Sequence, residues 1–169
     1  MNAILDNWNA METSSAASAL LHCCAAQRWA NGVTALRPYT TAEDLFAAAD
    51  RVWATMQEAD WMEAFGAHPR IGERKAPHAS AQSKEWSSKE QASVDAAQSR
   101  TLSELAAGNA RYEEFFGFTY VVCATGKTAE EMLEILQQRL KNDRQTELRE
   151  AAEQQRQITQ IRLRKWLEI

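Results

Sequence analysis

Glycine and proline are both scarce in this chain, with six glycines and three prolines among 169 residues. This scarcity argues against a β-sandwich or barrel, whose many short strands are joined by turns rich in glycine and proline. Helix-forming alanine, glutamate, glutamine, leucine and arginine are plentiful instead. A content of 45% hydrophobic and 25% charged residues is typical of a folded domain. We therefore expect an all-α fold, a single-domain multi-helix bundle over residues 1–169.

An excess of positive charge is also missing. Lysine and arginine number 19 against 23 aspartates and glutamates, which gives a net charge of −4. Proteins that bind DNA or RNA neutralise phosphates with clustered lysine and arginine, so we expect no nucleic-acid partner. The basic run at residues 162–165 lies in a predicted terminal helix, where such charge usually faces solvent.

Cysteine is limited to Cys23, Cys24 and Cys123, without any C-x-x-C spacing. An odd count with two adjacent residues does not indicate a disulfide framework, and the spacing does not indicate zinc. The histidines and cysteines also lack metal-ligand spacing, so no metal is expected. We expect a cytoplasmic, reducing compartment. The apolar stretch 16–26 is too short for a membrane span and is not a convincing signal peptide, so no membrane partner is expected.

Local capping patterns predict where most helices begin. Residues 2–35 read as two or three helices, and Thr40 or Thr41 caps another. Residues 61–67 form a short helix, the capping box Thr128–Glu131 opens a helix through Leu140, and a final helix starts near residue 145. The β-branched and aromatic residues 118–124 predict one short extended segment, called the strap below.

The middle of the chain is predicted to be less regular. Residues 69–86 have few apolar side chains and read as a long loop. The S-x-x-E pattern of Ser87–Glu90 predicts a capping box and a helix to about residue 107, ended by Gly108-Asn109. Residues 112–116 read as a separate short aromatic helix.

Arg162 falls inside an apolar helical stripe. At about 100° per residue, the following side chains lie within about 40° of it: Leu148, Ala151, Gln155, Ile158, Trp166 and Ile169. A buried guanidinium needs an anion or several carbonyl oxygens. Arg162 is therefore a ligand-binding group, part of a structural ion pair, or an arginine that snorkels at the edge of the stripe.

Glu90 and His68 are the other polar residues at unusual places. On the predicted helix, Glu90 shares a face with Trp86, Val94, Ala97 and Thr101. It can serve as the capping carboxylate, bind a ligand at a helix start, or do both. His68 lies at a helix end before Pro69, and its imidazole suits proton transfer near neutral pH, although a structural role is also open. We expect His78 to be exposed in a polar loop and His22 to be packed.

Four motifs in order resemble the family of OHCU decarboxylases, where OHCU is 2-oxo-4-hydroxy-4-carboxy-5-ureidoimidazoline. They are His68-Pro69-Arg70-Ile71-Gly72, Ser87-Ser88-Lys89-Glu90-Gln91, the segment from Phe116 to Cys123, and Ile161-Arg162-Leu163. The resemblance covers nearly the whole chain and includes Trp29 and Arg37-Pro38. Two positions depart from the family pattern, since Thr119 replaces an expected proline and Tyr120 an expected phenylalanine.

The resemblance implies an all-α, cofactor-free carboxy-lyase of purine and urate degradation that forms a homodimer. It implies that OHCU loses CO2 to give (S)-allantoin. By position, it matches His68 to the family's catalytic histidine. From the chemistry of the substrate, we hypothesise that Glu90 and Arg162 are catalytic as well. The implied substrate-binding residues are Pro69, Ser87, Ser88, Lys89, Glu90, Gln91, Tyr120, Val121, Val122, Cys123, Ala124 and Arg162.

Two alternatives are open at this point. One is a protein of the same fold that acts on or binds a related ureido or hydantoin acid, because Thr119 and Tyr120 could reshape the pocket. The other is a non-catalytic helical interaction module, in which His68, Glu90 and Arg162 are structural. Turnover of freshly made OHCU with release of CO2 would exclude the interaction module, and a panel of substrates would separate the enzyme that acts on a related acid.

Overall fold

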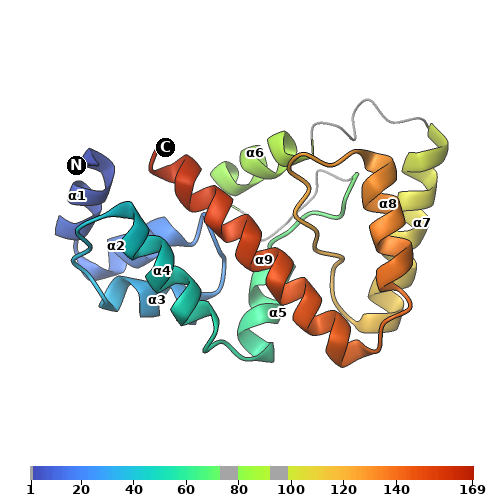
Figure 1. Cartoon of the computed structure of the whole chain (residues 1–169), viewed down its shortest axis with the longest axis horizontal. Helices are drawn as coiled ribbons and strands as arrows, with labels where there is room; N and C mark the ends of the chain where they lie inside the picture. The colour runs from blue at the N-terminus through green and yellow to red at the C-terminus, as the bar shows by residue number, and fades with distance from the viewer. Residues whose placement is uncertain (1, 73–79, 92–98) are drawn as a thin grey trace. The chain divides into compact units, whose positions relative to one another are not determined.

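A computed structural model describes residues 2–72, 80–91 and 99–169, and within these ranges the chain is helical with no β-strand. The all-α prediction is confirmed. The helices, labelled as in Figure 1, are α1 Ala3–Ala10, α2 Thr13–Leu20, α3 Gln27–Ala35, α4 Ala42–Trp53, α5 Glu58–Gly66, α6 Ala81–Glu90, α7 Ser99–Phe116, α8 Ala129–Arg139 and α9 Arg144–Trp166. None of the helices in the described ranges is long and apolar enough to cross a membrane.

Contacts divide the chain into two compact units. Unit 1 comprises residues 1–64 and 156–169, and unit 2 comprises residues 65–155. The boundaries fall inside α5 and α9, so each of these helices contributes to both units. The single domain expected over residues 1–169 stays a prediction.

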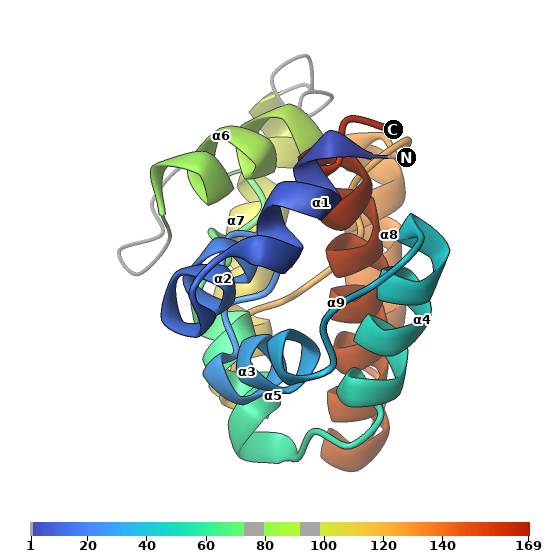
Figure 2. The same cartoon turned by 90° about the vertical axis from the view of Figure 1, so that its left-hand side faces the viewer.

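Unit 1 is built from short helices that follow one another in space. Helix α3 packs between α2 and α4 (Figures 1 and 2). Buried tryptophans fix the connections, because the Trp8 indole donates to the Ala16 carbonyl at 2.9 Å and the Trp29 indole to the Ala49 carbonyl at 3.1 Å. Asn2 caps α1 and also donates to the Leu167 carbonyl at 2.9 Å, which joins the first helix to the end of α9.

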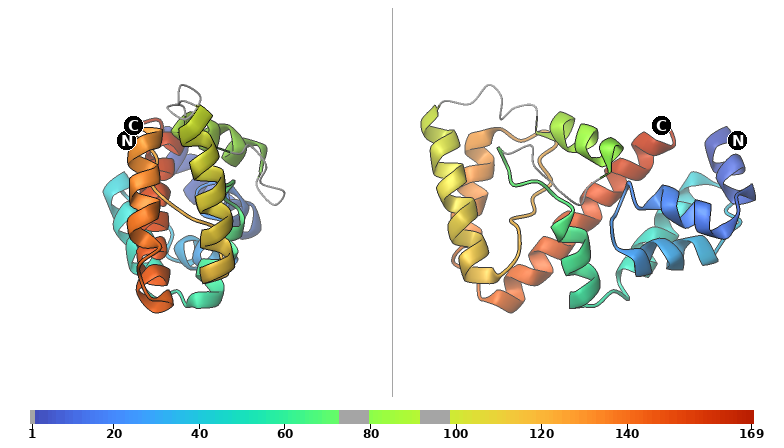
Figure 3. Two further views of the ribbon diagram at one scale, coloured as in Figure 1. Left: turned by 90° about the vertical axis from the view of Figure 1, so that its right-hand side faces the viewer. Right: turned by 180° about the vertical axis from the view of Figure 1, so that it is seen from behind.

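Unit 2 centres on the pair formed by α7 and α8, which lie side by side (Figure 3). Gly108 lies at this close approach, and a Cβ there would stand 2.5 Å from Leu136 Cδ2, so a larger residue would require the Leu136 side chain to shift. At the end of α7, Tyr112 packs its ring against Phe118 and Tyr120, with ring centroids 5.7 and 5.3 Å apart. This aromatic cluster covers the start of the strap.

Several local predictions are confirmed. Residues 2–35 contain α1, α2 and α3, and Thr41 opens α4 with a capping box completed by Asp44. Thr128 and Glu131 form the predicted capping box of α8. The strap connects α7 to α8 without helix. In the two capping boxes, each side chain contacts backbone only three residues away.

The predicted capping box at Ser87 is wrong. Helix α6 begins at Ala81, because the Ser80 hydroxyl accepts from the Ser83 amide at 3.1 Å, so Ser87–Glu90 is the last turn of α6. Residues 81–86 of the predicted long loop are therefore helical, and its residues 73–79 lie outside the described residues. The break at Gly108-Asn109 and the separate aromatic helix are also wrong, since α7 runs unbroken from Ser99 to Phe116. Packing of Gly108 against α8 outweighs its weak helix propensity.

Candidate active site

His68 lies in unit 2, just after the end of α5, with its ring half-buried. Its Nε2 lies 2.6 Å from Oε1 of Gln155, a residue of α9 that is only 1% exposed. An amide oxygen only accepts hydrogen bonds, so this contact is a hydrogen bond when Nε2 carries the ring proton. Gln155 was predicted only as a member of the apolar stripe, where a buried amide is a signal that a polar partner exists.

The segment that follows His68 is anchored at three successive residues within unit 2. Arg70 Nε donates to Glu113 Oε1 of α7 at 2.8 Å, and the Ile71 carbonyl accepts from Asn109 Nδ2 at 3.0 Å. The Gly72 amide donates to Gln91 Oε1 at 3.0 Å. These contacts explain the motif chemically, because each residue from Arg70 to Gly72 has its own polar partner.

Gly72 closes this segment with a left-handed backbone conformation, at φ +86°. L-residues with a Cβ rarely adopt this region, so glycine is favoured here. Pro69, which precedes Arg70, is buried and limits the backbone conformation available to His68. The sequence therefore fixes the direction of the chain on both sides of the anchored turn.

The Ser87–Gln91 positions divide into buried and exposed groups. Ser87 is buried, while Glu90 and Gln91 are half-buried. Ser88 and Lys89 are exposed, and Lys89 Nζ pairs with Glu85 at 2.6 Å on the surface of α6. No helix begins at Ser87, so Ser87, Glu90 and Gln91 do not lie at a helix N-terminus where they could bind a ligand as predicted. The apolar face predicted around Glu90 falls partly on Val94 and Ala97, which lie outside the described residues.

All five strap positions from Tyr120 to Ala124 are buried. Tyr120 turns its hydroxyl to the Met132 carbonyl at 3.0 Å, and the Cys123 amide donates to Gln154 Oε1 at 2.8 Å. The Val121 carbonyl accepts from Arg139 Nη1 at 2.7 Å, and the Cys123 carbonyl from Lys127 Nζ at 2.7 Å. Side chains of unit 2 thus hold the strap by its backbone.

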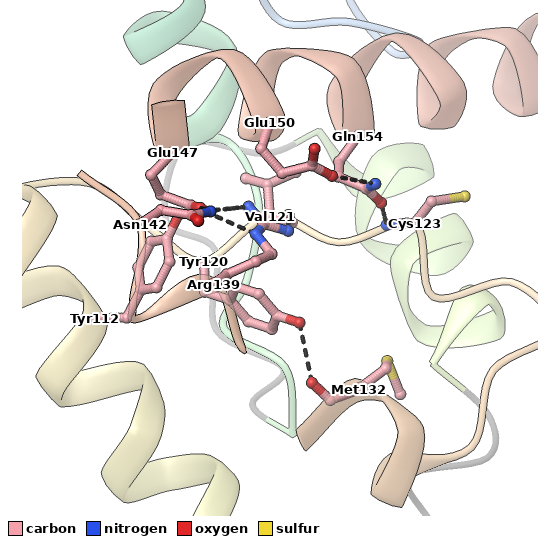
Figure 4. A network of polar contacts seen from close by, with 10 residues as sticks. All are labelled: Tyr112, Tyr120, Val121, Cys123, Met132, Arg139, Asn142, Glu147, Glu150 and Gln154. Carbon is pink, nitrogen blue, oxygen red and sulfur yellow. Dashed lines mark hydrogen bonds and ion pairs between the residues drawn. The ribbon is translucent and has the colours of Figure 1, made fainter. Parts of the chain in front are cut away.

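A buried ion pair supports this arrangement (Figure 4). Arg139 Nη2 lies 2.6 Å from Glu147 Oε1, and the two side chains are 6% and 0% exposed. Glu147 also accepts from the Tyr112 hydroxyl and, at 2.9 Å, from Asn142. Burial disfavours the charge on Arg139, but the adjacent Tyr112 and Glu147 outweigh it and hold the pKa of the guanidinium above its usual range. None of the sequence patterns described above predicted this network.

Arg162 is buried in unit 1, with 5% of its surface exposed, as its place in the stripe predicted. The stripe itself is confirmed from Leu148 to Ile158, whereas Ile169 is 63% exposed because α9 ends at Trp166. The charge lies near the buried thiols of Cys23 and Cys24. Burial raises the pKa of Cys24 to about 11, and the positive charge of Arg162 opposes that rise.

Two further features bear on what the site can hold. Among the described residues, no three histidine, cysteine, aspartate or glutamate side chains gather in a way that could bind a metal ion. A groove of about 250 Å³ lies between α7 and α8 in unit 2. It is lined by residues such as Ala107, Gly108, Arg111, Leu133 and Leu140, and none of the predicted site residues takes part.

Comparison with known proteins shows the family to which this chain belongs. The sequence pattern of the family described as OHCU decarboxylase matches residues 9–164. The chain belongs to the OHCU decarboxylase family. The family match spans the positions of His68, Glu90, Arg162 and the strap.

Individual relatives agree with the family assignment. The uric acid degradation bifunctional protein TTL of Arabidopsis thaliana is 36% identical over 144 residues, which is 85% of this chain and 44% of that protein. The 2-oxo-4-hydroxy-4-carboxy-5-ureidoimidazoline decarboxylase of Amia calva is 29% identical over 130 residues, 75% of this chain and 73% of that protein. The chain therefore spans less than half the length of the Arabidopsis relative.

The fold agrees as well. A crystal structure of OHCU decarboxylase in the presence of (S)-allantoin superposes with a TM-score of 0.76 at 30% identity. The match covers 94% of this chain and all of that one. The helical architecture of this chain is therefore that of an OHCU decarboxylase.

Proposed function

We propose that this chain is a carboxy-lyase that converts OHCU to (S)-allantoin and CO2 in urate degradation. The observation that carries the proposal is the family match over residues 9–164, which spans every proposed site residue. The fold shared with OHCU decarboxylase in the presence of (S)-allantoin supports it. The decarboxylation alone is proposed, because the longer Arabidopsis relative has sequence that this chain does not match.

The substrate supplies the chemistry that a cofactor would otherwise provide. Its carboxylate is attached to a carbon that bears a hydroxyl and adjoins a C=N bond. When the bond to CO2 breaks, its electron pair forms a C=C bond, and the C=N electrons move to nitrogen, which takes up a proton from solvent. The resulting enol becomes the ring carbonyl when the hydroxyl loses its proton and the ureido-bearing carbon gains one. Delivery of that proton to one face gives one enantiomer.

His68 is the proposed acid and base. Its imidazole can accept the hydroxyl proton or orient the departing carboxylate. The anchors on Arg70, Ile71 and Gly72 support this role, because they restrain the segment that carries the ring.

Glu90 and Arg162 are proposed to handle the polar atoms of the substrate. Glu90 would hold ring or ureido N–H groups, and Arg162 would stabilise charge on a ring or ureido oxygen. Placing Arg162 on the carboxylate would stabilise the ground state and slow the loss of CO2. The proposed binding surface also includes Pro69 and Ser87–Gln91.

The strap is proposed to contact the ring through its remaining backbone groups. The Cys123 amide and the carbonyls of Val121 and Cys123 already bond to side chains of unit 2, and the Tyr120 hydroxyl bonds to Met132. Residues 120–124 would therefore contact the substrate through their other backbone amides and through the surfaces of their side chains. Because Thr119 and Tyr120 stand at the start of this segment, they would influence selectivity through the position of the strap.

An assay from urate tests the function directly. Urate is oxidised in the presence of the purified chain, so that OHCU is made and consumed in one vessel. We expect CO2 release and rapid appearance of (S)-allantoin, followed by circular dichroism. Racemic allantoin formed at the uncatalysed rate would refute the proposal. A panel of related ureido and hydantoin acids tests selectivity.

Arg162→Met should lower kcat/KM for OHCU by about 10²-fold, the usual cost of removing a donor that stabilises developing charge. Arg164→Met is the matched control, because Arg164 lies two residues further on α9 with an exposed side chain against Phe46. It should keep normal kinetics. Thermal melting of both variants separates folding from chemistry. Normal kcat/KM in folded Arg162→Met would make Arg162 a structural residue.

Exhaustive chelation should leave turnover unchanged, because the substrate's own C=N bond accepts the electron pair. The measurement is kcat for chelated protein, with and without added Mg²⁺, Mn²⁺ or Zn²⁺. Activity that vanishes on chelation and returns with one of these ions would overturn the mechanism.

We further propose that the chain works as a homodimer in the cytoplasm. The family resemblance supports the dimer, and the three buried free thiols fit a reducing compartment. Light scattering coupled to size exclusion should give twice the chain mass of 19.0 kDa. A monomer at all concentrations would refute the dimer.

A further inference from the structure

Two consecutive glutamines of α9 hold different parts of the proposed site within unit 2. Gln154 Oε1 accepts from the Cys123 amide of the strap at 2.8 Å, across 31 residues of sequence. Gln155 Oε1 contacts His68 Nε2 at 2.6 Å, across 87 residues. One dipeptide thus links α9 to both the strap and the proposed acid and base.

The contact with Gln155 constrains the chemical state of the imidazole. The amide oxygen cannot donate, so the hydrogen bond requires a proton on Nε2. In the neutral ring the lone pair then resides on Nδ1. Gln155 is 1% exposed, so water has little access to replace it as the acceptor. An amide oxygen also accepts equally from an imidazolium, so the bond persists when the ring gains a proton.

We infer that Gln155 is a positioning residue that holds His68 with its proton on Nε2, which makes Nδ1 the ring nitrogen that exchanges protons with the substrate. The role of Nδ1 rests on the proposed function, whereas the hydrogen bond does not. In the step concerned, the substrate O–H bond breaks as the Nδ1–H bond forms, which leaves an imidazolium. That proton later leaves Nδ1 for the ureido-bearing carbon or for water, and the ring returns to its starting tautomer.

The tautomer can be read from the wild-type protein. In protein labelled with ¹⁵N-histidine, long-range ¹H–¹⁵N spectra distinguish protonated from unprotonated ring nitrogens. The His68 signals are assigned by their loss in His68→Asn. Above the pKa of the ring we expect a protonated Nε2 with a slowly exchanging N–H, and an unprotonated Nδ1. A proton on Nδ1 in the neutral ring would overturn the inference without any Gln155 variant.

Variants then test whether the contact matters. Gln155→Met has similar length but no acceptor, so the slow N–H signal should disappear and kcat should fall by at least about 10-fold, with KM little changed. Gln155→Glu keeps an acceptor oxygen and should keep the signal. Gln154→Met is the matched control, because it releases the strap and should raise KM while the His68 signal remains.

The outcomes separate the inference from the proposed function. Unchanged kcat in folded Gln155→Met, whether or not the signal is lost, would show that Gln155 does not position His68 for chemistry. If no protein, wild type included, consumes OHCU, the proposed function fails, and the ¹⁵N pattern still decides whether Gln155 sets the tautomer.

Discussion

His68→Asn should lower turnover of OHCU by at least about 10²-fold, because asparagine cannot exchange a proton near neutral pH. The fold should survive, since His68 follows the last turn of α5 and its ring is only half-buried. The measurement is kcat in the coupled assay from urate, together with a thermal melt. Asparagine can also occupy part of the space near Gln155, which limits the disturbance to packing.

His78→Asn is the matched control for this substitution. His78 lies outside the described residues and outside the proposed site. His78→Asn should keep the wild-type kcat. This control distinguishes the effect of replacing any histidine from the effect of removing the proposed acid and base. If His68→Asn turned OHCU over at the wild-type rate, another group would have to move the proton, and the proposed mechanism would be wrong.

The largest expected effect on stability comes from Glu147→Leu. This change leaves the 6% exposed Arg139 side chain without its carboxylate and removes an acceptor from Tyr112 and Asn142. Breaking a buried pair from one side costs about 3–5 kcal/mol of unfolding free energy, because the remaining charge is desolvated without compensation. Urea unfolding at neutral pH measures the loss.

Two comparisons make the result specific. The double variant Arg139→Met/Glu147→Leu removes both charges and should recover much of the lost stability. Glu104→Gln, which breaks the exposed Arg100–Glu104 pair on α7, should change stability by less than about 1 kcal/mol. If Glu147→Leu were as mild as Glu104→Gln, the buried pair would contribute little to the fold.

The same variants connect stability to function. Arg139 bonds to the Val121 carbonyl, so its removal releases the middle of the strap. The double variant should therefore show a raised KM for OHCU even where its stability is restored. Full stability together with an unchanged KM would mean that the strap keeps its position without Arg139.

Features with local causes were predictable from the sequence. Thr41 with Asp44 and Thr128 with Glu131 form capping boxes, in which each side chain reaches backbone only three residues away. The burial of Arg162 also followed from sequence, because helical periodicity depends only on spacing along α9. The capping contacts form within one helix, and the position of Arg162 on the buried face is set by the periodicity of one helix.

The same local pattern failed where another helix start preceded it. Ser87 and Glu90 have the spacing of a capping box, but Ser80 had already begun α6, so their amides bond within a helix. Gly108-Asn109 has the composition of a helix end, yet α7 continues because Gly108 packs against Leu136 and Asn109 donates to the Ile71 carbonyl. Both errors arise from context that the pattern itself does not contain.

By itself, the sequence determined the helical class, the capped helix starts, the buried arginine of α9 and the resemblance to OHCU decarboxylases. Only the tertiary structure decided which polar groups meet. Gln155 reaches His68 across 87 residues, and Tyr112 reaches Glu147 across 35. A buried amide or carboxylate must find a partner, and the sequence shows that need. Which partner it finds depends on how helices that are distant in sequence pack together. Hydrogen bonds form only over about 3 Å, and the number of residues between two groups does not tell how far apart they lie in space.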